Sequence, residues 1–514
     1  MDEQIVVGID LGTTFSAIAY VNQYGKPEII PNREGDRTTP SVVFFEDDGN
    51  PIVGKEARNQ AIIEPRRTVR FVKREMGNPS FRFNVDGKEY FPEDLSAMIL
   101  KKLKNDAEAH LGKDVSKAVI SVPAYFKDAQ REATRQAGQI AGLEVIRIIN
   151  EPTAAALAYG LDKVEGDQTL LVYDFGGGTF DVTIMRIQGK EFTVIATDGD
   201  EKLGGKDIDA KLVEYLAGEF QREHGIDLRL EAHTHQDLWD KAEIVKKDLS
   251  FREDFPVTLS AGGKTLRIDI DRELFNTLIN DIIKQTEDCL NRIIKEANLD
   301  WTAVDTILLA GGSSRIPAVK EMLSKVTGKD AARDMNPDEC VSLGAAVQAA
   351  ITVTETDGAG AVPELAGGSD IVVRDVASHS LGVKALSADK AKHINSIIIP
   401  RFTPIPCELT RTYGTNEDNQ SRVEIEVLQG EDENPRSPDV HLIGKAGLKN
   451  LPAHKAGELM IQVTLRYTAD GVIEVVAKEL QSGQMTREVV MRKAGALSSE
   501  IIKEKQEVLE QAAL

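Results

Sequence analysis

The sequence predicts a long α/β domain made of two related halves, followed by a smaller module built only of β-strands. Residues 170–185 (LLVYDFGGGTFDVTIM) and 5–21 (IVVGIDLGTTFSAIAYV) both have the pattern of a strand, an acidic residue, a glycine-containing turn and a second strand. The repeat is offset by 164 residues, the separation of Asp10 from Asp174, and indicates two equivalent lobes. Beyond residue 369 the pattern changes to short alternating strands separated by turns, which is typical of an antiparallel β module, such as a sandwich.

The glycine turns are suited to binding phosphate. Gly176, Gly177 and Gly178 remove every Cβ from a short arc, so that backbone N–H groups can approach an anion. Asp174 and Asp181 bracket the arc, and carboxylates beside a phosphate need a hard cation such as Mg²⁺ between them. A tight hairpin with two exposed acids fits the single motif equally well. The duplication favours a nucleotide site.

Other segments add polar groups to such a site. A third glycine turn at 308–315 follows an apolar strand and precedes a helix that begins near Pro317. Glu151 lies at the positive end of an alanine-rich helix, where it can cap the helix or position a water; its position alone favours the cap. Glu243, Lys246 and Lys247 share one helix face, either as a solvent-exposed ion-paired surface or as contacts to a ribose or base.

Composition excludes several classes of function. A net charge of −21 over 514 residues argues against nucleic acid as the main partner. The three cysteines form neither a disulfide framework nor a metal-ligand pattern, and the pair His233 and His235 lacks further ligands nearby. Apolar stretches are too short for a membrane span and the N-terminus is acidic, so neither a span nor a signal peptide is expected. A reducing cytoplasm fits these features.

Hydrophobic periodicity predicts the remaining elements. Helix-like patterns cover 54–74, 95–111, 129–141, 340–351 and 498–514. Apolar strands are expected at 42–45, 118–122 and 145–149, and then in the β module at 423–427, 459–467, 472–477 and 487–491. Residues 203–300 are expected to be rich in helix, with one sheet insertion at 257–270. The Gly-, Ala- and Thr-rich stretch 352–369 is predicted to be a flexible linker.

Ordered motifs then identify a family. The segments IDLGTTFS, SVPAYF, INEPTAAALAYG, DFGGGTFDV, LAGGSSRIP and NPDECVSLGAAVQAA, with SLGV, IPRFTPIP, TNEDNQSRVEIEVLQGE and DGVIEVVAKE, resemble those of the 70-kDa heat-shock (DnaK-type) chaperones over nearly the whole chain. The resemblance implies an actin-like (ribonuclease H-like) two-lobed ATPase domain at 1–351, a linker at 352–376, a β-sandwich that binds extended hydrophobic peptides at 377–492, and a short C-terminal helix at 493–514, the remnant of a helical lid. It also implies ATP or ADP, Mg²⁺ and K⁺ as cofactors.

Carried over motif by motif, the resemblance implies roles for individual residues. Asp10 and Asp174 would hold Mg²⁺, while the catalytic groups would be Lys73, Glu151, Thr179 and Asp181. Nucleotide contacts would come from Gly12, Thr13, Thr14, Gly176, Gly177, Gly178, Glu243, Lys246, Lys247, Gly311, Gly312, Ser313, Arg315 and Asp338. The peptide channel would include Val383, Leu386, Tyr413, Asn416, Val423 and Ile425, although Val423 and Ile425 equally fit a sandwich core. Coupling between the domains would involve Pro123, Arg131, Val372, Val373 and Asp375.

The sequence also departs from the family pattern. Lys247 replaces an arginine that stacks on adenine, and a lysine has no plane to stack, so weaker nucleotide binding is expected. Arg374 interrupts the apolar linker, so the sequence does not decide whether the linker docks on the first domain. A charged insertion, Ser387 to Lys392, follows Leu386, and the segment between Lys73 and Leu95 is short. With the helical lid reduced to one short helix, we expect bound peptide to dissociate fast in either nucleotide state.

Three classes of function remain open. An ATP-driven chaperone would act as a monomer with unfolded polypeptides, a J-domain co-chaperone and a nucleotide-exchange factor, and with neither nucleic acid nor membranes. An actin-like filament protein or a sugar kinase shares the paired turns but has no reason to carry the β module. A nucleotide-regulated adaptor with little hydrolysis and uncoupled peptide binding fits the interrupted linker, but the retention of Lys73, Glu151, Asp174, Thr179 and Asp181 argues against it.

Overall fold

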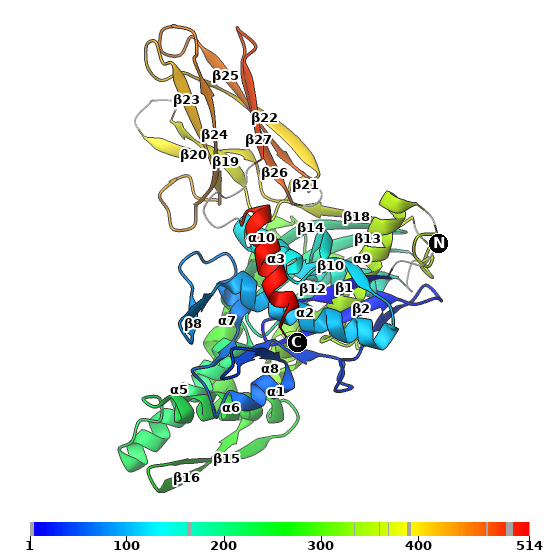
Figure 1. Cartoon of the computed structure of the whole chain (residues 1–514), viewed down its shortest axis with the longest axis vertical. Coiled ribbons are helices and arrows are strands. Elements are labelled where there is room, and N and C mark those ends of the chain that lie inside the picture. The colour runs from blue at the N-terminus through cyan, green and yellow to red at the C-terminus, as the bar shows by residue number, and fades with distance from the viewer. Residues whose placement is uncertain are drawn as a thin grey trace.

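A computed structural model describes residues 5–161, 166–333, 335–358, 360–368, 370–387, 392–468, 471–489 and 497–512. The α/β part occupies the middle and bottom of Figure 1, and the β module stands above it. The first lobe is built on a sheet in the order β11 (Glu144–Asn150), β10 (Val115–Val122), β1 (Ile5–Asp10), β2 (Phe15–Val21) and β3 (Pro27–Ile29), with β4 (Thr39–Pro40) paired to β2. Strand β1 runs parallel to β10 and antiparallel to β2.

The second lobe repeats this arrangement. Its sheet has the order β17 (Thr306–Ala310), β12 (Asp167–Phe175), β13 (Phe180–Gln188), β14 (Glu191–Asp200), β18 (Val372–Val376) and β21 (Pro404–Ile405). Strand β12 runs parallel to β17 and antiparallel to β13, as β1 does with β10 and β2. The predicted duplication is therefore present in the strand order, and it places Asp10 and Asp174 at corresponding ends of β1 and β12.

Two helices cross between the lobes. Helix α4 (Glu151–Gly160) packs against α9 (Cys340–Asp357), which also covers β1 and β2. Both contacts of α9 require glycine. Where α9 meets α4, a Cβ on Gly344 would lie 1.7 Å from the carbonyl oxygen of Ala154. Where α9 meets β1, a Cβ on Gly8 would lie 2.0 Å from the amide nitrogen of Ala346. Side chains of both helices share a buried core with the two sheets, which joins the lobes at their base.

Further elements complete the first lobe. Helices α2 (Pro92–Leu111) and α3 (Asp128–Ile140) pack with the first sheet. The outer part of this lobe holds β5 (Val42–Phe45), β6 (Pro51–Val53), α1 (Lys55–Gln60), β7 (Thr68–Arg70), the 3₁₀ turn η1 (Val72–Glu75), β8 (Phe83–Val85) and β9 (Lys88–Tyr90).

The second lobe extends toward the bottom of Figure 1. Helices α7 (Arg272–Glu296) and α8 (Pro317–Thr327) support its sheet, with the 3₁₀ turns η2 (Trp301–Ala303) and η3 (Gly312–Arg315) on either side of β17. The outlying part contains α5 (Gly205–His224), α6 (Ala232–Asp248), β15 (Asp254–Ala261) and β16 (Lys264–Asp271). The helix-rich segment with a sheet insertion is therefore present, as predicted.

Two sequence-based expectations are wrong. Residues 54–74 are not mainly helical: strand β7 interrupts them because it pairs with β5. The predicted flexible linker at 352–369 is partly ordered, because α9 continues through buried Thr352 and Val353 to Asp357.

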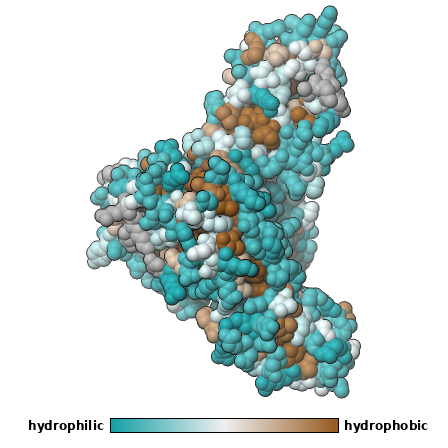
Figure 2. All heavy atoms as spheres, turned by 180° about the vertical axis from the view of Figure 1, so that it is seen from behind, coloured by the Kyte–Doolittle hydropathy of each residue, from teal (hydrophilic) through white to brown (hydrophobic). Residues whose placement is uncertain are grey.

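The β module consists of two four-stranded sheets around one core. One has the order β20 (His393–Ile399), β19 (Leu381–Leu386), β23 (Arg422–Gln429) and β24 (His441–Lys449). The other has the order β22 (Cys407–Gly414), β25 (Met460–Tyr467), β26 (Ile473–Glu479) and β27 (Met485–Val489). Seen from behind, the molecular surface is mostly hydrophilic, with one hydrophobic area on the lower part of the β module and others over the α/β part (Figure 2).

Helix α10 (Ser499–Glu510) lies against the first lobe beside α3, rather than against the β module (Figure 1). Leu509 is buried there, and Lys505 forms a 2.6 Å ion pair with Asp94. The predicted boundary at 492–493 and the middle of the charged insertion, 388–391, lie outside the described residues. Within the described part of the chain, no helix combines the length and the apolar character needed to cross a bilayer.

The helix crossing generates a stability prediction. Gly344→Ala should lower the urea midpoint of unfolding, because the added methyl meets backbone rather than a movable side chain; overpacking of this kind costs about 1–3 kcal/mol. Gly218→Ala is the matched control, because Gly218 also lies within a helix but has open space around its Cβ position. That control should gain about 0.5–1 kcal/mol. An equal midpoint for the two variants would contradict the close helix contact.

Candidate nucleotide site

A cavity of about 500 Å³ opens between the two lobes. The structure gathers nearly every residue predicted to contact nucleotide or metal around it: Asp10, Gly12, Thr13, Thr14, Lys73, Glu151, Asp174, Gly176, Gly177, Thr179, Glu243, Lys246, Lys247, Gly311, Gly312, Ser313, Arg315 and Asp338. The predicted residues Gly178 and Asp181 do not line it. Asp181 is buried beside it, where its carboxylate accepts hydrogen bonds from the backbone N–H groups of Ala124 and Tyr125 at 3.2 and 3.1 Å.

The glycine turns of the two lobes meet at the inner end of this cavity. A Cβ on Gly177 would lie 2.1 Å from the Thr14 hydroxyl, and one on Gly178 would lie 2.5 Å from the Thr13 side chain. The third turn joins them, since the Ser313 hydroxyl donates a 2.9 Å hydrogen bond to the carbonyl of Gly176. Any side chain on these glycines would push the turns apart, so their backbone amides converge only because the Cβ atoms are missing.

Buried charges line the same inner end. The Lys73 ammonium, on η1, pairs with the Glu151 carboxylate at 2.5 Å, and the two side chains are only 6% and 7% exposed. Burial raises the pKa of Asp10 to about 7, and Glu151 adds to the effect. Burial likewise raises the pKa of Asp174 well above its ordinary value and that of Asp181 to about 8. The predicted position of Glu151 at the start of α4 is confirmed.

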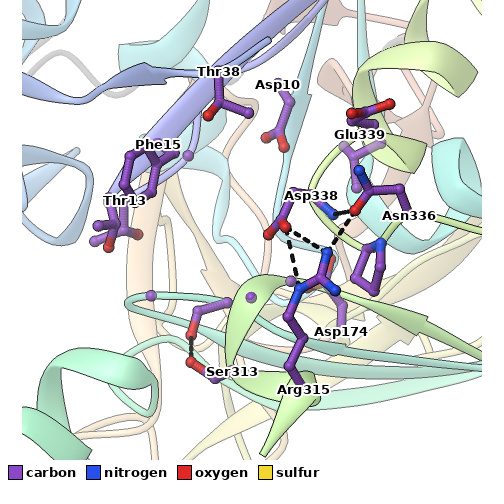
Figure 3. A pocket seen from close by; sticks show the side chains of 18 of the residues that line it. Asp10, Thr13, Phe15, Thr38, Asp174, Ser313, Arg315, Asn336, Asp338 and Glu339 are labelled. Atoms are coloured by element: carbon purple, nitrogen blue, oxygen red, sulfur yellow. Dashed lines mark hydrogen bonds and ion pairs between the residues drawn. The ribbon is translucent and has the colours of Figure 1, made fainter. Parts of the chain in front are cut away.

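Desolvation and the neighbouring carboxylates outweigh the attraction of Lys73, and together they raise the pKa of each of these carboxyl groups. Asp10 is the last residue of β1 and Asp174 the last but one of β12, and the two side chains face the cavity from opposite lobes (Figure 3). A hard cation with oxygen ligands would compensate their charge, and two carboxylates plus phosphate oxygens are a donor set that suits Mg²⁺. The residues present therefore fit this metal.

The outer end of the cavity carries different groups. Glu243 on α6 accepts hydrogen bonds from Lys247 at 2.7 Å and Arg58 at 2.8 Å. Burial alone would raise the pKa of Glu243, but Lys247, Arg58 and Lys246 outweigh burial and lower it to about 2. Lys246 is held by Asp209 at 2.8 Å, so the shared helix face is an ion-paired wall of the cavity.

A planar cation faces the cavity from the second lobe. The Arg315 guanidinium donates hydrogen bonds to the Asp338 carboxylate and the Asn336 side chain, each at 2.6 Å (Figure 3). These two partners fix the plane of the guanidinium. The predicted residues Arg315 and Asp338 therefore act together, and Asn336 is a neighbour that the sequence reasoning missed.

Other lining residues were also missed: Phe15, Arg37, Thr38, Ser250, Phe251, Pro337 and Glu339. Arg37 bonds Glu339 through two contacts, at 2.7 and 2.8 Å, and so connects the loop before β4 to the start of α9. A pair separated by 302 residues leaves no local signal in a sequence. His233 and His235 do not converge as a metal pair: His233 contacts the carbonyl of Ile62 at 2.9 Å, and His235 accepts a hydrogen bond from Trp239 at 3.1 Å.

The residues predicted to couple the domains form a chain of contacts from the cavity to β18. Asn150, directly before Glu151, donates a 2.7 Å hydrogen bond to the half-buried Asp375. Arg131 donates to the Asn150 side chain at 2.5 Å and also to the carbonyl of Ala124, which follows the buried Pro123. Burial raises the pKa of the Asp375 carboxyl.

The linker docks despite its interrupting charge. Val372, Val373 and Arg374 pair with β14, so β18 extends the sheet of the second lobe. Because side chains alternate along a strand, Arg374 points to solvent, where it is 57% exposed and pairs with Glu191 at 2.5 Å. The open question on docking is therefore answered: the sheet continues through β18 into β21 of the β module.

The predicted peptide-contacting residues divide into three groups. Val383 and Ile425 are buried in the core of the β module, at 3% and 4% exposure, which agrees with the core alternative for Ile425. Leu386, Tyr413 and Val423 are half-buried, and Tyr413 donates a 3.0 Å hydrogen bond to Ser396. Asn416 is exposed, with its backbone N–H bonded to Gln420.

His379 lies where the β module meets the first lobe. Its Nε2 contacts the carbonyl oxygen of Tyr125 at 3.0 Å, and its ring stands edge-on to the Tyr125 ring at 4.5 Å. Because a carbonyl only accepts, Nε2 carries the proton and Nδ1 is the site where a second proton would bind. Burial lowers the pKa of His379 to about 4, although the Tyr125 carbonyl and Glu431 oppose the shift; Lys127 and Arg401 reinforce it.

A cleft lined by paired glycine turns and joined to a β module through a docked strand is the arrangement of a nucleotide-binding protein made of two parts. Comparison with known proteins agrees. The family model described as Hsp70 protein matches residues 6–82 and 78–513. The chain is 45% identical to the chaperone protein DnaK of Thermotoga petrophila over 495 residues, covering 95% of this chain and 80% of the relative.

Further relatives give the same result. The chaperone protein DnaK of Thermotoga neapolitana is 44% identical over 508 residues, covering 98% of this chain and 82% of the relative. That of Thermosipho africanus is 43% identical over 494 residues, covering 95% and 80%. The chain belongs to the Hsp70 family. It is a DnaK-type molecular chaperone with ATPase activity.

The His379 contact predicts that docking of the β module depends on pH. A separated His379 is protonated below its ordinary pKa of 6.5, whereas the docked form resists protonation down to about pH 4. Docking should therefore be strongest above pH 6.5 and weaken by up to about tenfold per unit as the pH falls from 6.5 to 5. The fraction of docked molecules at each pH can be measured by energy transfer between a fluorophore in the α/β part and one in the β module.

His379→Asn should flatten this pH dependence, because the substituted side chain does not titrate. His393→Asn, at an exposed position of the same module, is the matched control and should keep the wild-type profile. A pH profile that is the same in the wild type and in His379→Asn would contradict the role of His379.

Proposed function

We propose that the chain binds Mg²⁺ and ATP in the cavity between the lobes and uses hydrolysis to switch the affinity of the β module for extended hydrophobic segments of unfolded proteins. One observation carries this proposal: Asn150, the residue directly before Glu151, donates a hydrogen bond to Asp375, which joins the cavity to the docked linker strand. A change in the cavity that moves Glu151, the first residue of α4, can therefore reach β18 through the adjacent Asn150.

In this proposal each group at the inner end of the cavity has a separate task. Asp10 and Asp174 hold Mg²⁺, and the turn amides of Gly12–Thr14 and Gly176–Thr179 hold the phosphate oxygens. Lys73 neutralises the charge that develops on the γ-phosphate. Glu151 and the side chains of Thr179 and Asp181 position the attacking water and a K⁺ ion.

The remaining predicted residues hold the nucleoside. Contacts to the ribose and base would come from Glu243, Lys246, Lys247, Gly311, Gly312, Ser313, Arg315 and Asp338. The different character of the two ends supports this orientation, since the inner end has carboxylates and amides for Mg²⁺ and phosphate, and the outer end has ion-paired side chains and a planar guanidinium. Phosphoryl transfer needs chiefly positioned groups and neutralised charge, which this cavity supplies.

The β module would bind an extended peptide by backbone hydrogen bonds and by burying apolar side chains, each worth roughly 1.5–3 kcal/mol for a residue the size of leucine. Leu386, Tyr413, Asn416 and Val423 would contact it, with Val383 and Ile425 beneath them. The proposed division is an actin-like ATPase domain at 1–351, a linker at 352–376, a substrate domain at 377–492 and a C-terminal helix at 493–514. We expect a cytoplasmic monomer that works with a J-domain co-chaperone and a nucleotide-exchange factor.

Substitution of Lys73 tests the catalytic part of the proposal. Lys73→Ala should lower the single-turnover rate of ATP hydrolysis at least about 100-fold, because it removes the ammonium that faces the γ-phosphate. The dissociation constant for ADP, which lacks that phosphate, should change much less. Lys320→Ala removes an exposed lysine of α8 and should leave both values unchanged. Hydrolysis at the wild-type rate in Lys73→Ala would contradict the assignment.

A further inference from the structure

An exposed aromatic ring at the outer end of the cavity has no role so far. Phe251 follows the C-terminal end of α6, where its backbone N–H donates a 2.9 Å hydrogen bond to the carbonyl of Asp248. Its side chain is 80% exposed, although it belongs to the lining of the cavity. A phenylalanine this exposed leaves most of its apolar area in water, and it gains stability only when a partner covers it.

The position of Phe251 identifies the part of a nucleotide that it would meet. Carboxylates, Lys73 and the glycine turns occupy the inner end of the cavity, which suits Mg²⁺ and phosphates. Phe251 lies four residues beyond Lys247, on the wall formed by the end of α6, together with Ser250. Because the inner end takes the phosphates, the outer end of the cavity would hold the nucleoside part of ATP.

The neighbouring lysine does not provide a flat surface. The Lys247 ammonium is bound to Glu243 at 2.7 Å and lies 5.1 Å from the centroid of the Phe15 ring. An ammonium is a point charge on a flexible stem, so it offers no plane to a base. The Arg315 guanidinium, fixed by Asp338 and Asn336, offers one flat surface on which a base could stack. The exposed ring of Phe251 offers a second.

We propose that Phe251 stacks on the base of the bound nucleotide and, with the Arg315 guanidinium, gives the cavity its affinity for purines. The inference rests on the proposed nucleotide site and adds to it the residue that recognises the base. Stacking of a base on an aromatic side chain contributes enough affinity to compensate for a lysine at position 247. Purines present a larger π-face than pyrimidines, so selectivity for purine nucleotides follows.

Calorimetry on the full chain with Mg²⁺ tests the proposal, with ADP, CDP and inorganic tripolyphosphate as ligands. Phe251→Ala should weaken ADP binding about tenfold and narrow the preference for ADP over CDP, while tripolyphosphate binds as it does to the wild type. Phe251→Trp should bind ADP at least as tightly as the wild type. Its extra tryptophan emission should be quenched by ADP and unaffected by tripolyphosphate.

Two control variants separate stacking from other effects. Phe251→Leu keeps an apolar side chain without a ring and should behave like Phe251→Ala. Leu230→Ala removes another exposed apolar side chain, 83% exposed and outside the cavity lining, and should bind all ligands as the wild type does.

The possible failures are distinguishable. If the wild type binds ADP and Phe251→Ala binds it equally well, the proposed nucleotide site stands and stacking by Phe251 is wrong. Equal weakening of ADP and tripolyphosphate binding also overturns stacking, because it shows a general distortion of the cavity. If the wild-type chain binds neither ADP nor tripolyphosphate, both this inference and the proposed function fail.

Discussion

Several carboxylates gather where the two lobes meet, and the rest of the structure depends on how their negative charge is compensated. Half-buried Asp10 and buried Asp174 and Glu151 lie at the inner end of the cavity, with buried Asp181 beside it, and Lys73 is the ammonium bonded to Glu151 there. Removing one partner of a buried ion pair typically costs 3–5 kcal/mol, so Lys73 stabilises this arrangement, and added cations complete the compensation of its negative charge. The cleft is therefore built to take up Mg²⁺ together with an anion that shares it.

The start of α4, which carries one of these carboxylates, also connects the cavity to the linker. Strand β11 carries Asn150 at its end, helix α4 begins with Glu151, and the two neighbours face different partners: Glu151 contacts Lys73, and Asn150 contacts Asp375. A shift of the start of α4 by a fraction of an ångström changes both contacts. Interfaces packed this closely, with Gly344 where α9 meets α4, favour discrete arrangements over gradual deformation.

Local chemistry could be predicted from the sequence, and long-range pairing could not. The duplicated motif located Asp10 and Asp174 because strand, acid and glycine are adjacent in the chain, whereas Arg37 and Glu339 meet only through the fold. The helical pattern around Lys73 was misleading, because pairing of β7 with β5 overrides local propensity. Arg374 seemed to break the linker, but alternation along β18 turns its side chain to solvent. The sequence could not assign Ile425 to the core or to the peptide channel, because strand periodicity marks an inward face without showing what covers it; the structure buries the residue in the core.

The most direct test of the coupling is the affinity of the full chain for a labelled, extended hydrophobic peptide, measured by fluorescence anisotropy with ATP and then with ADP. We expect weaker binding with ATP, by a factor of about 5–150, which corresponds to a coupling free energy of 1–3 kcal/mol. Asp375→Ala should reduce this ratio toward one, while Arg374→Ala, which removes an exposed ion pair, should preserve it. Equal affinity of the wild type in both nucleotides would contradict the account and leave an ATPase with a passive peptide-binding module.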